Sequence, residues 1–435
     1  MRIGLFTDTY FPQINGVGAS VHTLAQQLRA RGHEVFVITA SDPHRTANPN
    51  DPVISMASVP FIFLKQFRAG MVFSPHQLYA IQHLQLDIVH TQTEFSLGFF
   101  GRFYAKVYRI PTVHTYHTMY ADYTHYIGGG KLVTPAMAIE FSKLFCNGAD
   151  EVVVPTQKVK DTLMEYGVTR PIHIIPTGIP LAHFRKETYR PEEIAALRAE
   201  VGLSPETPVI LSLGRVAKEK SIDVVIAALP KLLQKLPKAK LVIVGDGPYA
   251  EVLKQQAAAL GVAESVLFLG ARPWAEIGKY YQLGDVFVSA STSETQGLTF
   301  AEAMAAGTPV LAKKDESIHG LLEDEVNGIV FDTDASLPDR LYELLSDPAK
   351  RERLARAARE SVEALSDENF GKNIEALYKE VLSAQPAAHS LPAPIRHVAT
   401  IPNAIGEQVV KARVLLRNAA EKPKRLVQNQ LKKLQ

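Results

Sequence analysis

The sequence predicts an α/β protein in which two doubly wound parallel sheets follow one another along the chain. Short apolar runs alternate with helical patterns, the runs are continuously apolar, and the pattern is interrupted once near the middle. Continuous runs of Val, Ile and Leu are typical of strands that are buried on both faces of a parallel sheet. The interruption, rich in proline and charge, lies at residues 176–191 and separates the two series of strands.

Each series contains six predicted strands. The first series comprises residues 2–7, 34–39, 87–91, 111–114, 151–154 and 172–175, and the second comprises residues 209–213, 241–244, 266–269, 286–289, 310–312 and 329–331. Amphipathic helices lie between them, among them Ser20–Arg31, with Ser20 as N-cap and Gly32 as C-cap. A helical stretch at residues 349–384 follows, and three prolines separate it from a tail that is expected to be helical from about Ile405.

Composition excludes several classes of protein. Hydrophobic residues make up 46% of the 435 residues and charged residues 21%, which suffices for large cores and argues against disorder. The single cysteine, Cys146, excludes an internal disulfide and a cysteine-based zinc site, and favours a reducing compartment. We expect no signal peptide and no apolar run of about 20 residues that spans a bilayer, hence a soluble chain that can still lie on a membrane.

The net charge of +2 hides an asymmetry along the chain. Residues 391–435 contain nine basic and two acidic side chains, a net charge of +7, whereas the preceding residues contain 38 basic and 43 acidic ones, a net charge of −5. A basic tail on an acidic body suggests an anionic surface as partner. The expected surface is that of an anionic membrane, and no nucleic acid is expected as partner. The alternative is a solvated helix without a partner.

The strongest motif follows the fourth strand of the second series. Backbone amides at Gly297 and Leu298 begin a helix that Gly307 ends, and amides at such a start form an anion site. Glu294 precedes the start of the helix and Glu302 lies more than a turn beyond it. The Glu294 carboxylate can therefore accept hydrogen bonds from a sugar, and that of Glu302 from a ribose, on either side of a phosphate. The alternative is one glutamate favoured by the helix dipole and one on the surface.

The first loop of the second series contains two cations, Arg215 and Lys220. Together they can bracket a diphosphate and neutralise its charge as it leaves. The alternative is a solvated basic loop. The next loop, Val244–Pro248, is a tight turn that suits phosphate contact or turn chemistry alone.

The loop after the first strand contains Gly16, Val17 and Gly18, whose backbone amides can approach a phosphate from the other series. Its GxG pattern superficially offers a nicotinamide dinucleotide site. However, the loop begins at Asp8 and is too long for the usual tight turn, and Val21 replaces the third glycine. A dinucleotide is therefore not expected.

His117 follows a predicted strand of the first series, where an active-site residue of an α/β protein would stand. A hydrogen-bonded core histidine is the alternative, and it is the preferred interpretation for His114, inside the strand. The four tyrosines between residues 116 and 126 are expected in the core or around an acceptor pocket.

In order and spacing these motifs resemble those of the retaining GT-B glycosyltransferases of family 4, over about residues 1–385. The motifs concerned are the Glu294/Glu302 pair, Gly214–Lys220, the early glycine loop, His117 and the linker Pro176–Ile179. Within that family, Phe6–Pro12 and Thr115–Tyr120 are similar to segments of bacterial diacylglycerol glucosyltransferases. Asn15 and Thr177 stand where many members have Gly and Asn.

The resemblance implies two Rossmann-like domains that face a cleft. It places an acceptor-side domain at residues 1–180, a nucleotide-sugar-binding domain at 181–348, helices at 349–385 that cross back to the first domain, and a basic helical tail at 386–435.

It also implies a role for each candidate site residue. The candidate catalytic residues are His117, beside the C6 hydroxyl and the anomeric carbon, Glu294, near the C3 hydroxyl, and Arg215 and Lys220, on the diphosphate. The other donor contacts are Glu302, on the ribose, and the backbone at Gly16, Val17, Gly297 and Leu298.

The implied reaction moves glucose from UDP-glucose to 1,2-diacylglycerol with retention of the α configuration, giving a membrane glycolipid or a lipoteichoic-acid anchor. No cofactor is implied. Asp332-Thr333-Asp334 spells a D-x-D motif, but a metal is not expected because Arg215 and Lys220 already supply positive charge, and Asp334 or Ser336 is expected to cap the next helix.

Several alternatives remain open at this point. The acceptor can be phosphatidylinositol, a soluble sugar or a protein, the hexose can be galactose, and the chain can be a silent nucleotide-sugar-binding protein or an epimerase. The expected location is the cytoplasmic face of the cell membrane, with the protein held peripherally by the tail or by residues 60–73.

Overall fold

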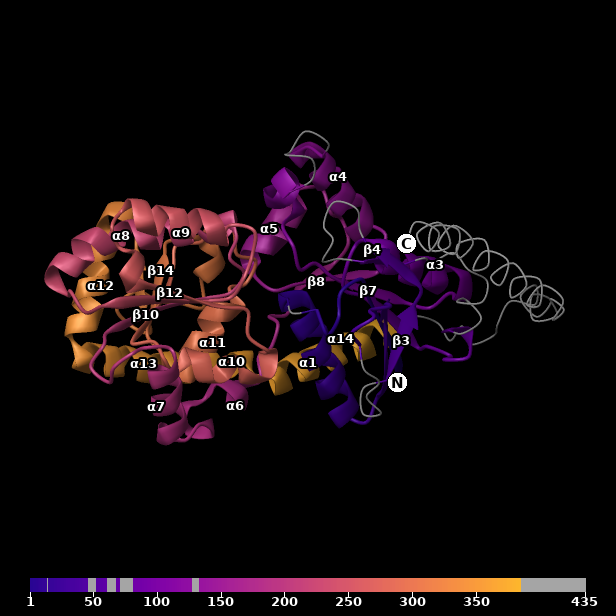
Figure 1. Ribbon diagram of the computed structural model, residues 1–435. Helices are drawn as coiled ribbons and strands as arrows, with labels where there is room; N and C mark the ends of the chain where they lie inside the picture. Colours follow the sequence, from indigo (N-terminus) through magenta and orange to yellow (C-terminus); the bar gives the residue numbers. More distant parts are fainter. Residues whose placement is uncertain (14, 46–51, 61–67, 71–80, 127–132, 385–435) are drawn as a thin grey trace, which may run out of the picture. The chain divides into compact units, whose positions relative to one another are not determined.

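The structure, a computed structural model, describes residues 1–13, 15–45, 52–60, 68–70, 81–126 and 133–384. It contains two parallel sheets that follow one another along the chain (Figure 1). The first has the order β3 (Val53–Met56), β2 (Glu34–Ala40), β1 (Arg2–Thr7), β6 (Ile88–Thr91), β7 (Thr112–Thr115), β8 (Glu151–Val154) and β9 (Ile172–Ile174). The second has the order β12 (Val266–Gly270), β11 (Lys240–Val244), β10 (Val209–Leu213), β13 (Val286–Ser289), β14 (Val310–Lys313) and β15 (Ile329–Phe331).

All twelve predicted strands are present, and the first sheet has one more than expected. The additional strand, β3, lies at the edge and pairs with β2 from Val53 to Met56. Its first three residues are partly or fully exposed, so it lacks the continuous apolar character that marks a buried strand. A separate antiparallel pair, β4 (Ser58–Pro60) and β5 (Arg68–Gly70), was also not predicted.

Helices connect the strands. Those of the first series are α1 (Gly16–Ala30), α3 (Ser96–Tyr108), α4 (Pro135–Cys146) and α5 (Gln157–Glu165), with the 3₁₀ segment η1 (Tyr120–Tyr126). Those of the second are α6 (Leu181–Phe184), α7 (Pro191–Glu200), α8 (Ile222–Lys235), α9 (Ala250–Ala259), α10 (Trp274–Tyr281), α11 (Leu298–Ala306), α12 (Leu337–Ser346), α13 (Pro348–Val362) and α14 (Asp367–Ala384).

Helix α1 begins earlier than predicted. Asn15, not Ser20, is its N-cap, and the Asn15 side chain accepts a hydrogen bond of 2.8 Å from the backbone amide of Gly18. Asparagine is among the strongest N-cap residues, so it starts the helix one turn sooner. The predicted end is confirmed, because Gly32 takes a left-handed φ of +84° just after the helix.

The C-terminal helical stretch is two helices instead of one. It breaks at residues 363–365, where the Ile179 amide donates to Leu365 O and the Asp367 amide donates to Ile179 O. After the break, α14 packs on α1 and shares a core with the first sheet through Phe370, Ile374 and Tyr378. The chain therefore returns from the second sheet to the first.

The linker before α6 packs closely against the first turn of α14. A Cβ on Gly178 would lie 2.6 Å from the Phe370 side chain and 2.7 Å from Asp367 Cα, so only glycine fits there. Further along α14, the Tyr378 hydroxyl lies 2.6 Å from His90 Nδ1 in β6.

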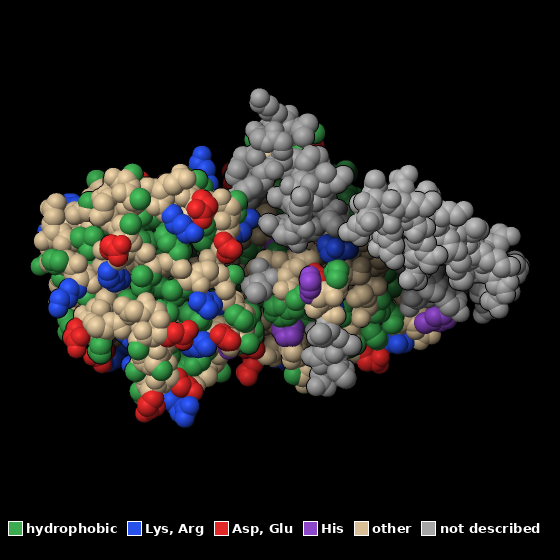
Figure 2. Space-filling view, in the orientation of Figure 1, with side chains coloured by type: hydrophobic (Ala, Val, Ile, Leu, Met, Phe, Trp, Pro, Cys, Tyr) green, Lys and Arg blue, Asp and Glu red, His purple; other side chains and the backbone are tan. Residues whose placement is uncertain are grey.

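Charged side chains of both signs are interspersed over the visible face of the second series (Figure 2). Within the described ranges, no helix combines the length and the apolarity that a bilayer crossing requires. The predicted tail helix and residues 61–67 and 71–73 of the proposed membrane segment lie outside the described residues. Cys146 is buried with a free thiol.

Candidate active site

Two helix N-termini, one from each series, lie next to each other. Gly297 is the N-cap of α11 with a left-handed φ of +72°, and Gly307 ends that helix, as predicted. A Cβ on Gly16, the first residue of α1, would lie 3.8 Å from Leu298 Cδ1, at the start of α11. The first amides of a helix lack intrahelical acceptors, so two donor-rich ends meet at this point. Of the two amides predicted for α1, that of Gly18 is already bound by Asn15.

An ion pair joins two of the predicted catalytic residues. Lys220 Nζ lies 2.6 Å from Glu294 Oε1, and both side chains are largely buried. Burial alone would raise the pKa of Glu294, but the charge and hydrogen bond of Lys220 outweigh it and hold that pKa below its ordinary value. Glu294 is therefore ionised at neutral pH.

The loop around Arg215 packs against the neighbouring Val244–Pro248 turn. The guanidinium of Arg215 pairs with Glu219 on the same loop. Gly245 has φ of +139°, and a Cβ there would lie 1.8 Å from Gly214 O, while the Val216 amide donates to Asp246 O. Turn geometry and close packing therefore account for the glycines of the second loop.

Glu302 lies on α11 and is partly buried, as predicted for a residue in the helix. The Tyr281 hydroxyl donates to its Oε2 at 2.6 Å, and no Lys or Arg of the described chain forms an ion pair with it. Burial raises the pKa of Glu302 to about 7, although the Tyr281 hydrogen bond lowers it somewhat. A buried carboxyl without a cation destabilises the fold, which favours a role in binding.

We expect Glu302→Gln to stabilise the protein at pH 8 and to weaken donor binding. Between pH 4.5 and about 7 the unfolded chain releases this proton while the folded chain retains it, so stability falls as the pH rises through that window. Because glutamine does not titrate, the variant lacks this loss of stability, which amounts to roughly 1–3 kcal/mol in the wild type. Urea unfolding at pH 5 and pH 8 measures it, with Glu360→Gln on exposed α13 as the matched control. If the free energy of unfolding of Glu302→Gln changed between pH 5 and pH 8 as much as that of the wild type, the expectation would be contradicted.

His117 lies just beyond the end of β7, as predicted, and is partly buried. Its Nε2 lies 2.8 Å from Gln92 Oε1, beyond the end of the neighbouring strand β6. Burial and the proximity of His114 lower the pKa of His117 to about 3, so the ring is neutral at physiological pH. Nε2 then donates to Gln92, and Nδ1 is left as an acceptor.

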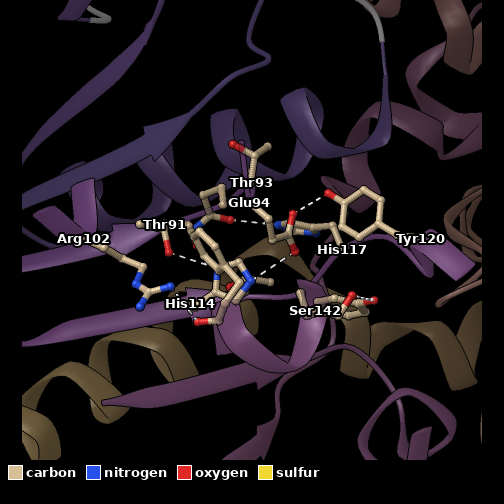
Figure 3. A network of polar contacts seen from close by, with 12 residues as sticks. Thr91, Thr93, Glu94, Arg102, His114, His117, Tyr120 and Ser142 are labelled. Carbon is tan, nitrogen blue, oxygen red and sulfur yellow. Dashed lines mark hydrogen bonds and ion pairs between the residues drawn. The ribbon is translucent and has the colours of Figure 1, made fainter. Parts of the chain in front are cut away.

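Below His117 lies a buried polar network (Figure 3). His114 is fully buried, with Nδ1 at 3.0 Å from Thr91 O and Nε2 at 3.1 Å from Glu94 Oε1. The Thr91 hydroxyl also lies 2.9 Å from Nδ1, so both ring nitrogens of His114 have hydrogen-bond partners inside the fold. The Tyr120 hydroxyl donates to the other oxygen of Glu94. The preferred interpretation of His114 as a core residue is confirmed.

The predicted tyrosines divide between the two alternatives. Tyr116 is buried and its hydroxyl lies 2.9 Å from Ser142 Oγ, so it belongs to the core. Tyr120 is partly buried and is tied to the network through Glu94. The side chains of Tyr123 and Tyr126 lie outside the described residues.

The loop that precedes α11 is braced by residues of the first series and of the linker. Gln296 is buried and makes two hydrogen bonds with the backbone of Thr177, of 2.8 and 2.9 Å. Thr156 Oγ1 donates to Thr295 O, and Lys158 pairs with Asp315 at 2.8 Å. Lys158 also donates to Thr292 O at 3.5 Å, so the loop is held on either side of Glu294.

Both aspartates of the D-x-D motif form ion pairs with lysines. Asp334 pairs with Lys313 at 2.8 Å and Asp332 pairs with Lys314 at 3.4 Å. Ser336 stands at the N-cap position of α12, as predicted, although its hydroxyl donates to Thr333 O and makes no capping hydrogen bond. Within the described part of the chain, no group of three His, Cys, Asp or Glu side chains is arranged to hold a metal ion.

Three residues of this region were not singled out from the sequence: Gln92, Glu94 and Gln296. Gln92 and Glu94 stand in a polar run directly after a buried strand, which is a signal that could have found them. Gln296 lay inside a recognised motif, but its partner Thr177 is 119 residues away.

Two family descriptions match consecutive parts of the chain. "Glycosyltransferase Family 4" matches residues 14–183, and "Glycosyl transferases group 1" matches residues 193–361.

Curated relatives are similar over nearly the whole described chain. The alpha-monoglucosyldiacylglycerol synthase of Streptococcus pneumoniae is 40% identical over 383 residues, which cover 88% of this chain and 86% of that protein. The synthase of the same name from Acholeplasma laidlawii is 36% identical over 392 residues, covering 88% of this chain and 98% of that protein.

Solved structures share the fold. HepE of Anabaena, in complex with UDP and glucose, gives a TM-score of 0.72 with 21% identity, covering 88% of this chain and 100% of that one. The sucrose-phosphate synthase of Thermosynechococcus elongatus gives 0.72 with 22% identity, covering 88% and 99%. The predicted fold with two doubly wound domains is thereby confirmed.

Proposed function

The chain belongs to glycosyltransferase family 4, and from this premise we propose that it transfers glucose from UDP-glucose to 1,2-diacylglycerol with retention of the α configuration. The product is a monoglucosyl-diacylglycerol of the membrane. The acceptor and the sugar follow the names of the two curated relatives. The observation that supports the donor most directly is the Lys220–Glu294 ion pair, because Glu294 lies in the loop that leads to α11 and Lys220 lies in the loop after β10.

The donor diphosphate is proposed to lie at the point where α1 and α11 begin. The backbone amides of Gly16, Val17, Gly297 and Leu298 would receive its oxygens, and Lys220 and Arg215 would neutralise its charge. Cations placed where negative charge grows on the leaving group lower the barrier.

Two carboxylates would then orient the rest of the donor. Glu302 would accept hydrogen bonds from the ribose, and Glu294 from the hexose near its C3 hydroxyl. Lys220 keeps the Glu294 carboxylate ionised before the donor binds, so at neutral pH this carboxylate can accept hydrogen bonds from the hexose.

The reaction breaks the bond between the anomeric carbon and the phosphate oxygen and forms one to the acceptor oxygen on the same face. The leaving phosphate oxygen takes the acceptor's proton, so no protein base is required. Neutral His117 would accept a hydrogen bond from the C6 hydroxyl through Nδ1 and hold the sugar at this point. Positive charge on the diphosphate comes from Lys220 and Arg215, so we propose a reaction without metal or cofactor.

A donor-by-acceptor matrix tests this function. UDP-glucose and UDP-galactose are combined with diacylglycerol vesicles, phosphatidylinositol vesicles and soluble sugars, with and without EDTA, and products are analysed by mass spectrometry and NMR. We expect an α-glucosyl product on diacylglycerol at an undiminished rate in EDTA. If EDTA abolished the activity and manganese restored it, Asp332 and Asp334 would be assigned to a metal site. Transfer only to another acceptor, or a changed sugar nucleotide without acceptor, would replace the proposal by one of the alternatives.

Peripheral binding to the cytoplasmic face of the membrane is proposed for the same reason, since the acceptor stays in the bilayer. The tail beyond residue 390, with a net charge of +7, attracts anionic lipid at about 1 kcal/mol per basic residue before screening. We expect the full chain to sediment with phosphatidylglycerol vesicles more than with phosphatidylcholine vesicles, and less as salt rises. Equal sedimentation with both vesicles would contradict this attraction.

A further inference from the structure

Helix α3 presents aromatic side chains to the solvent. Phe95, the N-cap, and Phe99 and Phe103 on the following turns are 48%, 41% and 44% exposed. Their spacing of four residues places them on one side of the helix, opposite the buried Leu97 and Tyr104. Single exposed apolar residues are common on protein surfaces, but a contiguous aromatic row marks an interaction site.

The row continues onto helix α4 and to the candidate active site. The ring of Phe141 lies 6.2 Å from that of Phe95 and 6.1 Å from that of Phe99, and Leu144 beside it is 68% exposed. The ring of Tyr120 lies 5.6 Å from Phe95 and 6.3 Å from Phe141. Since the Tyr120 hydroxyl donates to Glu94, the aromatic row ends at the polar network below His117.

Charge on this helix has one sign. The α3 sequence contains Arg102 and Lys106 and no acidic residue, and Arg109 follows at its C-cap. At 100° per residue, the exposed Lys106 lies within the arc of the three exposed phenylalanines. Arg102 is partly buried and donates to Phe145 O at 3.1 Å, so it does not count toward the exposed charge. Aromatic and basic residues on one helix face are the pattern of an element that lies at an anionic lipid surface.

We propose that this surface, the aromatic face (Phe95, Phe99, Phe103, Phe141 and Leu144), contacts the acyl chains of the lipid acceptor in an anionic bilayer. The acceptor hydroxyl would then reach the active site past Tyr120 and Glu94. The inference rests on the proposed function, because it assumes an acceptor with two acyl chains. A second copy of the chain is the competing occupant, and the experiment below separates the two.

Contact with lipid chains is measured by fluorescence. Trp274 is the single tryptophan, so the full chain with Trp274→Phe and Phe99→Trp reports on the aromatic face alone. We expect phosphatidylglycerol vesicles with brominated acyl chains to quench this tryptophan. The matched control places tryptophan at Val252, which is 44% exposed on α9 of the second series, and no quenching is expected there. Equal quenching at both positions, or none at Phe99→Trp, overturns the proposal.

Access of the acceptor is measured by activity. Phe99→Ser combined with Phe103→Ser should lower transfer to diacylglycerol in vesicles at least about tenfold, because apolar contact scales with buried area. The slow release of UDP to water without acceptor should be unchanged, which separates acceptor access from donor binding. Val252→Ser combined with Leu260→Ser, two exposed residues on α9 and at its C-cap, is the control and should transfer normally.

The outcomes distinguish the two proposals. If the wild type transfers nothing to diacylglycerol, the proposed function fails, and this inference falls with it. If the wild type transfers and the double variant transfers equally well, the function stands and the aromatic face is overturned as the acceptor's route. If sedimentation velocity shows that the wild type is a dimer and the double variant a monomer, and the tryptophan of Phe99→Trp is not quenched, the aromatic face is an interface between two copies.

Discussion

His117→Ala is expected to lower the rate of glucosyl transfer by about two to three orders of magnitude while leaving the fold intact. The neutral ring donates from Nε2 to Gln92, which leaves Nδ1 for the sugar of the proposed complex, so alanine would remove the group that is proposed to position the anomeric carbon. A misplaced reacting centre typically costs about 10²-fold in rate. Turnover at saturating donor and acceptor is the measurement, with circular dichroism as the check on folding.

The pH profile and two further variants sharpen this test. Since the pKa of His117 is lowered to about 3, its titration should leave no inflection in the turnover of the wild type between pH 5.5 and 8. Gln92→Leu, which leaves the ring but removes its hydrogen-bond acceptor, should cause a smaller loss than His117→Ala. His173→Ala, a partly exposed histidine at the sheet edge paired with Glu151, is the matched control. Near-normal transfer by a folded His117→Ala protein would make His117 a structural residue.

Lys220→Ala should lower turnover by about 10²- to 10³-fold at saturating donor. Negative charge on the diphosphate grows as the bond to glucose breaks, so a cation in contact with it stabilises the transition state more than the bound donor. The Lys220 ammonium lies 2.6 Å from Glu294, the residue that is proposed to contact the hexose. Full turnover in the variant would contradict the leaving-group role.

The same variant should change the pH dependence. Without Lys220, the burial of Glu294 is no longer offset by that charge, so the pKa of this carboxyl is expected to lie above its wild-type position. Residual activity of Lys220→Ala should therefore rise with pH between 5 and 8 more steeply than that of the wild type. Lys218→Ala, on the same short turn but exposed, removes an equal charge and is expected to retain normal turnover. A comparable loss in Lys218→Ala would assign the effect to net charge.

The sequence by itself determined the strands of both sheets except the edge strand β3, and the helix that begins at Leu298 and ends at Gly307. These features depend on local patterns, such as continuous apolar runs and glycine at a helix end. It also selected the residues of the candidate site, because motifs after strands lie at the carboxyl edge of a parallel sheet. The start of α1 differs from the prediction because Asn15, and not Ser20, caps the helix, and both are residue types that favour an N-cap.

The tertiary structure alone decided which of these residues meet. Lys220 and Glu294 are 74 residues apart, His114 and Glu94 are 20 apart, and Gly16 approaches Leu298 from the other sheet. Periodicity describes the environment of a residue along its own element, but it contains no information on the partner across a sheet or between sheets. The aromatic face shows the same limit: a phenylalanine-rich helix suggests a core element, and only the packing of α3 decided that three of these rings face solvent.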